Sequence, residues 1–96
     1  MPFRKIIFEE IQSDLTHLIL ENSSFQIIEG ISNLPNLQNL YLFNTDCNSL
    51  DLSLNKNLEV ININTQIAPY TNFNLSIHSK KYTEIRINNN IFLNLT

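Results

Sequence analysis

A spacing of apolar residues that recurs four times constrains the fold of this chain more than any other feature. The spacing is L-x-x-L-x-L, and its copies begin at Leu15, Leu37, Leu58 and Tyr82. The final residues of each copy alternate, so that one set of side chains points inward and the other outward on a short strand. A dozen or more residues separate successive strands, which excludes hairpins. We therefore predict parallel strands that are joined by return segments.

The three return segments differ from one another. The first, residues 25–34, spaces its apolar residues by three, which suits a 3-10 or irregular turn. The second, residues 47–54, alternates by two and predicts a nearly extended segment. The third, residues 67–81, is the longest. It alternates by two between residues 73 and 77, which predicts a short strand on the convex side.

These residues resemble the leucine-rich repeat family in its short bacterial type. Residues 15–36 resemble the 22-residue repeat, residues 51–59 resemble the 21-residue form, and the resemblance covers residues 15–90. It implies an α/β-type solenoid dominated by β, right-handed, with a parallel sheet on the concave face and irregular or 3-10 returns. Where the family usually places Asn after the strand, this chain has Ser23, Thr45, Gln66 and Asn90. We expect Gln66, which is longer, to make the third turn less regular.

The ends of such a stack need covering. We expect one domain, residues 1–96, with a cap strand in residues 1–14 and repeats in residues 15–36, 37–57, 58–81 and 82–96. Only about seven residues separate Phe8 from the first repeat, so we predict a truncated cap. It is either an antiparallel strand or a half-turn, with Ile11 packed beneath. The apolar residues of 91–95 fold back over the last repeat or leave an edge that pairs with a second copy.

Composition restricts the class of protein. A chain of 96 residues with 43% apolar residues is too short for two independent cores. No apolar run approaches the ~18 residues of a membrane span, and Glu9 and Glu10 argue against a secretory signal. The six Lys and Arg residues are scattered and the net charge is -3, which disfavours nucleic acid as a partner. A single cysteine, Cys47, fits a reducing compartment, so we expect a cytoplasmic protein.

Candidate catalytic, cofactor and metal sites are absent from the sequence. The two histidines, His17 and His78, have no cysteine at ligand spacing. Cys47 lies at an inward position, where we expect a small buried hydrophobe and not a nucleophile. The single glycine, Gly30, is too little for a phosphate-binding loop. We therefore expect no enzymatic activity, no cofactor and no metal.

The outward residues of the strands are the candidate binding site. Adjacent strands lie about 4.8 Å apart, so these residues form three columns across one face. The predicted partner-binding residues are Ile19, Glu21, Asn39, Tyr41, Phe43, Val60, Asn62, Asn64, Glu84 and Arg86. Four of them are large and apolar, and aromatic residues are enriched in interface cores. Alternatively, β-branched and aromatic residues stand here because they favour strands.

Two functions fit this sequence. The first is a non-enzymatic module that binds one protein partner through its concave sheet. In general character it resembles bacterial immunity proteins that cover the active site of a toxin, and the acidic rim would steer a basic toxin. The alternative is a structural or scaffold element, whose exposed solenoid ends self-associate into a homo-oligomer.

Overall fold

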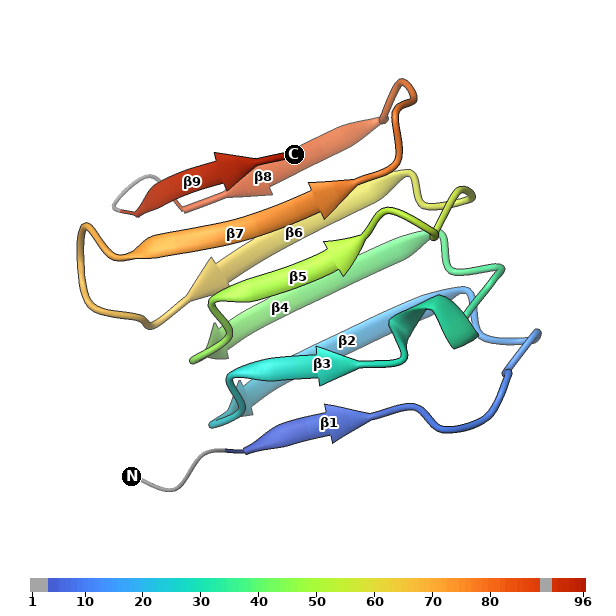
Figure 1. Ribbon diagram of the computed structural model, residues 1–96, viewed down its shortest axis with the longest axis horizontal. Helices are drawn as coiled ribbons and strands as arrows, with labels where there is room; N and C mark the ends of the chain where they lie inside the picture. Colours follow the sequence, from blue (N-terminus) through green and yellow to red (C-terminus); the bar gives the residue numbers. More distant parts are fainter. Residues whose placement is uncertain (1–3, 89–90) are drawn as a thin grey trace.

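The computed structural model describes residues 4–88 and 91–96, and it coils the chain into two layers of parallel strands (Figure 1). One layer contains the L-x-x-L-x-L segments and is called here the repeat sheet. Its strands, in order, are β2 (His17–Ser23), β4 (Asn39–Thr45), β6 (Val60–Thr65) and β8 (Glu84–Ile87). All neighbouring strands of this sheet pair in parallel. The predicted parallel-sheet solenoid is thus confirmed.

The return segments form a second parallel sheet, called here the return sheet. Its strands, in order, are β1 (Lys5–Ile7), β3 (Ile27–Glu29), β5 (Ser49–Leu52), β7 (Asn72–Ile77) and β9 (Phe92–Leu95). The described residues contain one helix, the 3-10 turn η1 (Ile31–Asn33). The fold is therefore nearly all β, and the α/β label in the sequence expectation is wrong. No helix in the described part of the chain is long and apolar enough to cross a membrane.

The second and third returns have their predicted local character, whereas the first does so only in part, because residues 27–29 form the strand β3, which the three-residue spacing did not predict. The first contains the 3-10 turn η1 behind β3, the second is extended as β5, and the third contains β7. Their strands are in register with one another, for example Ser49 with Asn74 and Asn74 with Asn94. This alignment makes the returns a continuous sheet, which is more regular than the family resemblance implies. In Figure 1, the strands of the near layer run rightward and those of the far layer run leftward, and each turn lies above the one before it. The coil is therefore right-handed.

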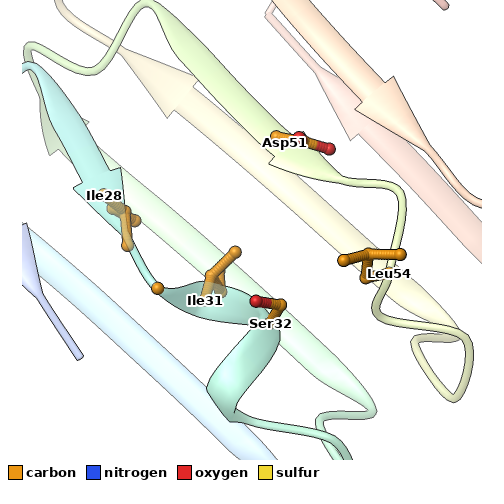
Figure 2. Close-up of a pocket in the computed structure, with 6 residues that line it drawn as sticks. Ile28, Ile31, Ser32, Asp51 and Leu54 are labelled. Atoms are coloured by element: carbon orange, nitrogen blue, oxygen red, sulfur yellow. The ribbon is translucent and has the colours of Figure 1, made fainter. Parts of the chain in front are cut away.

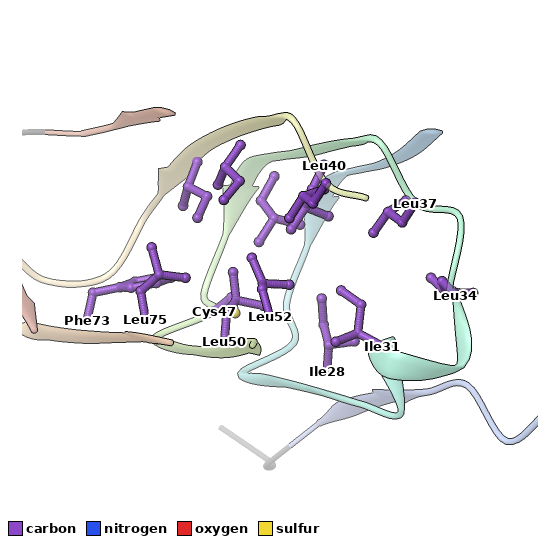
Figure 3. Close-up of a cluster of buried hydrophobic side chains, with 14 of the residues drawn as sticks. Ile28, Ile31, Leu34, Leu37, Leu40, Cys47, Leu50, Leu52, Phe73 and Leu75 are labelled. Carbon is purple, nitrogen blue, oxygen red and sulfur yellow. The ribbon is translucent and has the colours of Figure 1, made fainter. Parts of the chain in front are cut away.

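The core lies between the two sheets (Figure 3). Register aligns Leu40 with Ile61 and Leu42 with Ile63, and all four side chains are buried. From the other layer, Leu52 and Phe73 are buried against them. The predicted assignment of inward and outward residues is therefore confirmed for the central strands.

The amino-terminal end is a half-turn. β1 pairs with β3 in parallel, which excludes the antiparallel alternative. The expectation that Ile11 packs beneath this cap is wrong, because Ile11 is 72% exposed. The N–H of Gln12 donates to the carbonyl of Asn33 at 2.9 Å. This bond fixes the segment along the outside of the coil, where the neighbouring Ile11 gains little cover.

The carboxy-terminal segment also differs from the expectation. β9 does not fold back over the last repeat; it adds to the open edge of β7 as the next parallel strand. Phe92 N–H donates to Thr71 O at 2.9 Å, and Thr96 N–H donates to Leu75 O at 2.9 Å. These backbone bonds extend the return sheet and leave Leu93 and Leu95 exposed. Of the two predicted possibilities for residues 91–95, the structure therefore has the second, an end that is left uncovered.

Amide side chains connect successive turns near the carboxyl ends of the repeat-sheet strands. Asn22 and Asn44 have φ of 56° and 55°, a left-handed conformation that Asn tolerates. Asn44 Nδ2 donates to Asn22 Oδ1 at 3.0 Å, and Gln66 Nε2 donates to Asn44 Oδ1 at 3.1 Å. Gln66 thus continues the amide ladder, but the third turn departs from the first two: the register of β4 and β6 shifts between Phe43 and Thr45, and no residue at the carboxyl end of β6 has the left-handed conformation of Asn22 and Asn44. The buried polar residue of the third turn is Thr65, which pairs with Thr45; Asn90 lies outside the described residues.

Candidate protein-binding face

The predicted partner-binding residues come together on the outer face of the repeat sheet. Register gives one column of Ile19, Tyr41, Asn62 and Arg86. A second column contains Asn39, Val60 and Glu84, and a third contains Glu21, Phe43 and Asn64. The columns therefore exist as the alternation predicts. The concavity that the family resemblance implies for this face stays a prediction.

An aromatic pair lies at the centre of this face. Tyr41 and Phe43 are two residues apart on β4, so their side chains emerge on the same side. Their ring centroids are 6.0 Å apart and their planes differ by 27°, a stacked arrangement. Asn39 Nδ2 donates to the Tyr41 hydroxyl oxygen at 3.1 Å. These contacts limit the rotamers of Tyr41, so less side-chain entropy remains to be lost on binding.

Ile19 extends the apolar surface from Tyr41 to the neighbouring strand. It is the direct cross-strand partner of Tyr41 and is 58% exposed. Val60 pairs with Asn39 and therefore stands diagonal to Tyr41, and it is partly buried. The predicted apolar cluster is thus a patch of three residues, Ile19, Tyr41 and Phe43, with Val60 at its border. We call these three residues the aromatic patch.

Charged side chains stand around the aromatic patch. Arg86 Nε and Glu84 Oε1 form an ion pair within β8, so the two charges offset each other. Glu21 is the exposed carboxylate in the column of Phe43. Exposed ion pairs contribute only about 0–1 kcal/mol. Glu21 therefore places a negative charge beside Phe43.

Cys47 takes no part in this face. It is fully buried, and its Sγ donates to the carbonyl of Ser49 at 3.4 Å. Loss of solvation raises the pKa of the thiol to about 11, so the neutral thiol dominates at pH 7. The expectation of a small buried hydrophobe is confirmed. Among residues 4–88 and 91–96, no three His, Cys, Asp or Glu side chains are placed to hold a metal ion.

A cavity of about 130 Å³ lies on the return side of the molecule, and the sequence did not indicate it (Figure 2). Its lining residues are Ile28, Gly30, Ile31, Ser32, Asp51 and Leu54. Ser53 donates to Asp51 through its hydroxyl at 2.6 Å and its N–H at 3.1 Å, which lowers the pKa of Asp51. The carboxylate is thus already hydrogen-bonded within its own turn. We assign no ligand chemistry to this cavity.

Comparisons with known proteins give no family or relative. No family model, curated protein or solved structure matches the chain. Its function must therefore be argued from its own surface, of which the aromatic patch on the repeat sheet is the most distinctive part.

Proposed function

We propose that this protein is a non-enzymatic interaction module that binds one protein partner against its repeat sheet. The observation that carries this proposal is the stacked pair of Tyr41 and Phe43 on an outward sheet face, beside the exposed Ile19. Large apolar groups on an outward face favour association, because contact with a partner removes them from water. Tyr is also enriched among the residues that dominate binding energies.

The sheet supports this role mechanically. β4 pairs with β2 on one side and β6 on the other, so the backbone beneath the aromatic patch is fixed. A rigid binding surface loses little conformational entropy on association. Truncation of a well-packed aromatic anchor typically costs about 2 kcal/mol or more of binding free energy.

The chemistry of the partner follows from the residues around the aromatic patch. Glu21 stands in the column of Phe43, and Arg86 is paired with Glu84. A partner that presents an apolar group beside a cation would satisfy both the patch and Glu21. In its most concrete form, our proposal is an immunity-type protein that covers a basic toxin. The net charge of -3 is consistent with it.

The proposal predicts separable effects on binding and stability. Tyr41→Ala and Phe43→Ala should each weaken binding to the protein encoded by the adjacent reading frame at least tenfold. Thermal stability should change little, because both side chains are on the outer face. Calorimetric titration and thermal unfolding measure the two quantities. Asn72→Ala is the matched control, because Asn72 is exposed on β7 of the return sheet, and it should bind as the parent protein does.

Two results would contradict the proposal. The first is that both Tyr41→Ala and Phe43→Ala unfold the protein, which would show that these rings belong to the core. The second is a pair of well-folded variants that protect cells from the neighbouring gene product as well as the parent does. Failure of the parent protein to bind or protect would also reject the immunity form of the proposal.

A further inference from the structure

Glu21, Phe43 and Asn64 stand side by side across the outer face of the repeat sheet. They are register partners on β2, β4 and β6. Neighbouring parallel strands lie about 4.8 Å apart, so each side chain is next to the following one. The Phe43 ring is therefore flanked by a carboxylate on one side and by an amide on the other. We call these three residues the Phe43 column.

The two polar side chains of the Phe43 column are open to a ligand. Both Glu21 and Asn64 are exposed. Within residues 4–88 and 91–96, neither side chain forms a hydrogen bond or an ion pair with another part of the chain. The carboxylate and the amide oxygen are thus both available as acceptors.

The neighbouring columns differ in this respect. Asn39 Nδ2 already donates to the Tyr41 hydroxyl oxygen, and Arg86 already pairs with Glu84. Of the three charged residues in the columns, Glu21 is therefore the one without an ion pair in the described part of the chain. Its charge must be met from outside if this face is covered.

A partner that covers the aromatic patch also covers Glu21. Glu21 is the direct cross-strand neighbour of Phe43, and it lies two residues after Ile19 on the same face of β2. Removal of a carboxylate from water without a compensating charge is strongly unfavourable. Since no cation of the described chain pairs with Glu21, the partner has to bring one.

An arginine side chain suits the Phe43 column better than a lysine does. The guanidinium group is planar and weakly hydrated, it stacks on aromatic rings, and it presents five N–H donors in a fixed fork. Over Phe43, its donors can reach the acceptors of Glu21 and Asn64 on opposite sides of the ring. A lysine ammonium is a compact and strongly hydrated charge, so it gains less from the ring.

We propose that the Phe43 column is a guanidinium-binding site for an arginine of the protein partner. The guanidinium group stacks on Phe43 and donates to the Glu21 carboxylate and to the Asn64 amide oxygen. The apolar groups of the partner then contact Ile19 and Tyr41, the rest of the aromatic patch. This inference rests on the proposed function, and it names the residue with which the partner is anchored.

A blocked amino acid tests the site without the partner. Nα-acetyl-arginine amide, titrated into the isotope-labelled protein, should shift the backbone amide resonances of Glu21, Phe43 and Asn64 saturably in nuclear magnetic resonance spectra. The lysine analogue should bind at least threefold more weakly, because its charge is more strongly hydrated. The citrulline analogue is similar in shape to the arginine compound but is uncharged, and it should not reach saturation.

Two variants separate the contribution of the charge from that of the ring. Glu21→Gln keeps the shape of the side chain and should weaken arginine binding at least threefold. Phe43→Leu keeps an apolar residue and should remove the preference for arginine over lysine. Glu10→Gln is the matched control, because it removes the same charge from an exposed position outside the repeat sheet and should leave binding unchanged.

Three results would overturn the proposal. They are absence of a saturable shift with the arginine compound, equal affinity of the parent protein for the arginine and lysine compounds, and arginine affinity that is unchanged by both Glu21→Gln and Phe43→Leu. Sedimentation of the protein alone examines a second copy as the occupant. A mass that rises with concentration in the parent protein and not in Phe43→Ala would assign this face to a second copy and reject an arginine from a different protein.

The guanidinium site and the proposed function can fail separately. A partner that needs Tyr41 but binds Glu21→Gln as tightly as the parent protein would reject the guanidinium site and leave the interaction module in place. Saturable arginine binding, together with failure to bind the product of the adjacent reading frame, would support the guanidinium site and reject the immunity form of the proposed function.

Discussion

The buried polar side chains differ in whether they have hydrogen-bond partners. Asn55 Nδ2 is hydrogen-bonded, whereas the hydroxyl groups of Thr45 and Thr65 have no partner in the described part of the chain. Cys47 is buried nearby and has only its contact with Ser49 O. Burial of a polar group without a partner lowers stability. These residues therefore set local limits on stability, and Cys47 does so in a way that depends on pH.

Cys47 should make stability fall at alkaline pH. The pKa of its thiol is raised from 9.0 to about 11 in the folded protein. Below pH 9 the thiol is protonated in both states, so it adds no pH dependence. Between about pH 9 and pH 11 only the unfolded chain ionises, which favours unfolding by roughly 2–3 kcal/mol. Denaturant unfolding at several pH values measures this change.

The control for this effect is Cys47→Ala. Its overall stability can differ from that of the parent, but its loss of stability between pH 9 and pH 11 should be smaller. An identical slope in both proteins would contradict the role of Cys47. Because the thiol is buried, a thiol reagent at pH 7 should modify it only as fast as the protein unfolds.

At the residue scale, the alternation of apolar and polar residues was enough to predict which side chains face inward on β4 and β6. It could not show that Thr65, and not Gln66, is the buried polar residue of its turn. The left-handed Asn44 adds a residue to β4 that β6 lacks, so the register shifts between Phe43 and Thr45. The alternation of apolar and polar residues does not reveal a bulge of this kind.

At the scale of elements, a side chain of one turn supports the 3-10 helix of the turn before it. Asn55 Nδ2 donates to Ile31 O at 2.9 Å and to Leu34 O at 3.3 Å, at the two ends of η1. Gly30 directly precedes η1; it has φ of 75°, and a side chain there would collide with the Phe8 carbonyl. The first return thus depends on the turns on both sides of it.

Asn55→Ala should destabilise the protein by about 1–3 kcal/mol, because it removes both buried bonds and leaves a gap. Asn57→Ala is the matched control. It removes an exposed donor to Pro35 O, at 2.9 Å, and should cost less than about 1 kcal/mol. Denaturant unfolding of the two variants provides the comparison. Equal losses of stability in the two variants would show that the bonds to η1 contribute no more than the exposed bond from Asn57.

The elements at the two ends were the least predictable. Apolar residues in 91–95 indicate that the segment is attached to the fold, but the same residues suit a cover or a further strand. The open backbone edge of β7 decides between these outcomes, and that edge is a property of the assembled sheet. Likewise, the apolar Ile11 indicated burial, whereas the bond from Gln12 to Asn33 fixes its segment on the outside.

At the scale of the whole molecule, stability depends on one core that runs through all the turns. The buried residues of β4, β5, β6 and β7 belong to a single cluster, and partly buried residues of the outer turns pack against it. Since each turn is covered by its neighbours, loss of a central side chain should weaken the entire stack. Terminal side chains should matter less.

Leu42→Ala tests this dependence on position. Leu42 is fully buried at the centre of the repeat sheet, so its truncation should cost about 2–5 kcal/mol. Leu95→Ala removes the same atoms from an exposed position on β9 and should cost much less. Thermal and denaturant unfolding measure both. Similar losses for the two variants would mean that the end of the coil is as tightly packed as its centre.

The amide ladder has a consequence for how such a chain can change in length. Asn22, Asn44 and Gln66 are spaced by 22 residues, and each amide bonds to the equivalent side chain of the adjacent turn. A tandem duplication of one such stretch in the gene would therefore place Asn44 beside a copy of itself, with a compatible donor and acceptor. Growth by whole turns is the form of insertion that this architecture accepts, and each added turn would widen the binding face by one strand.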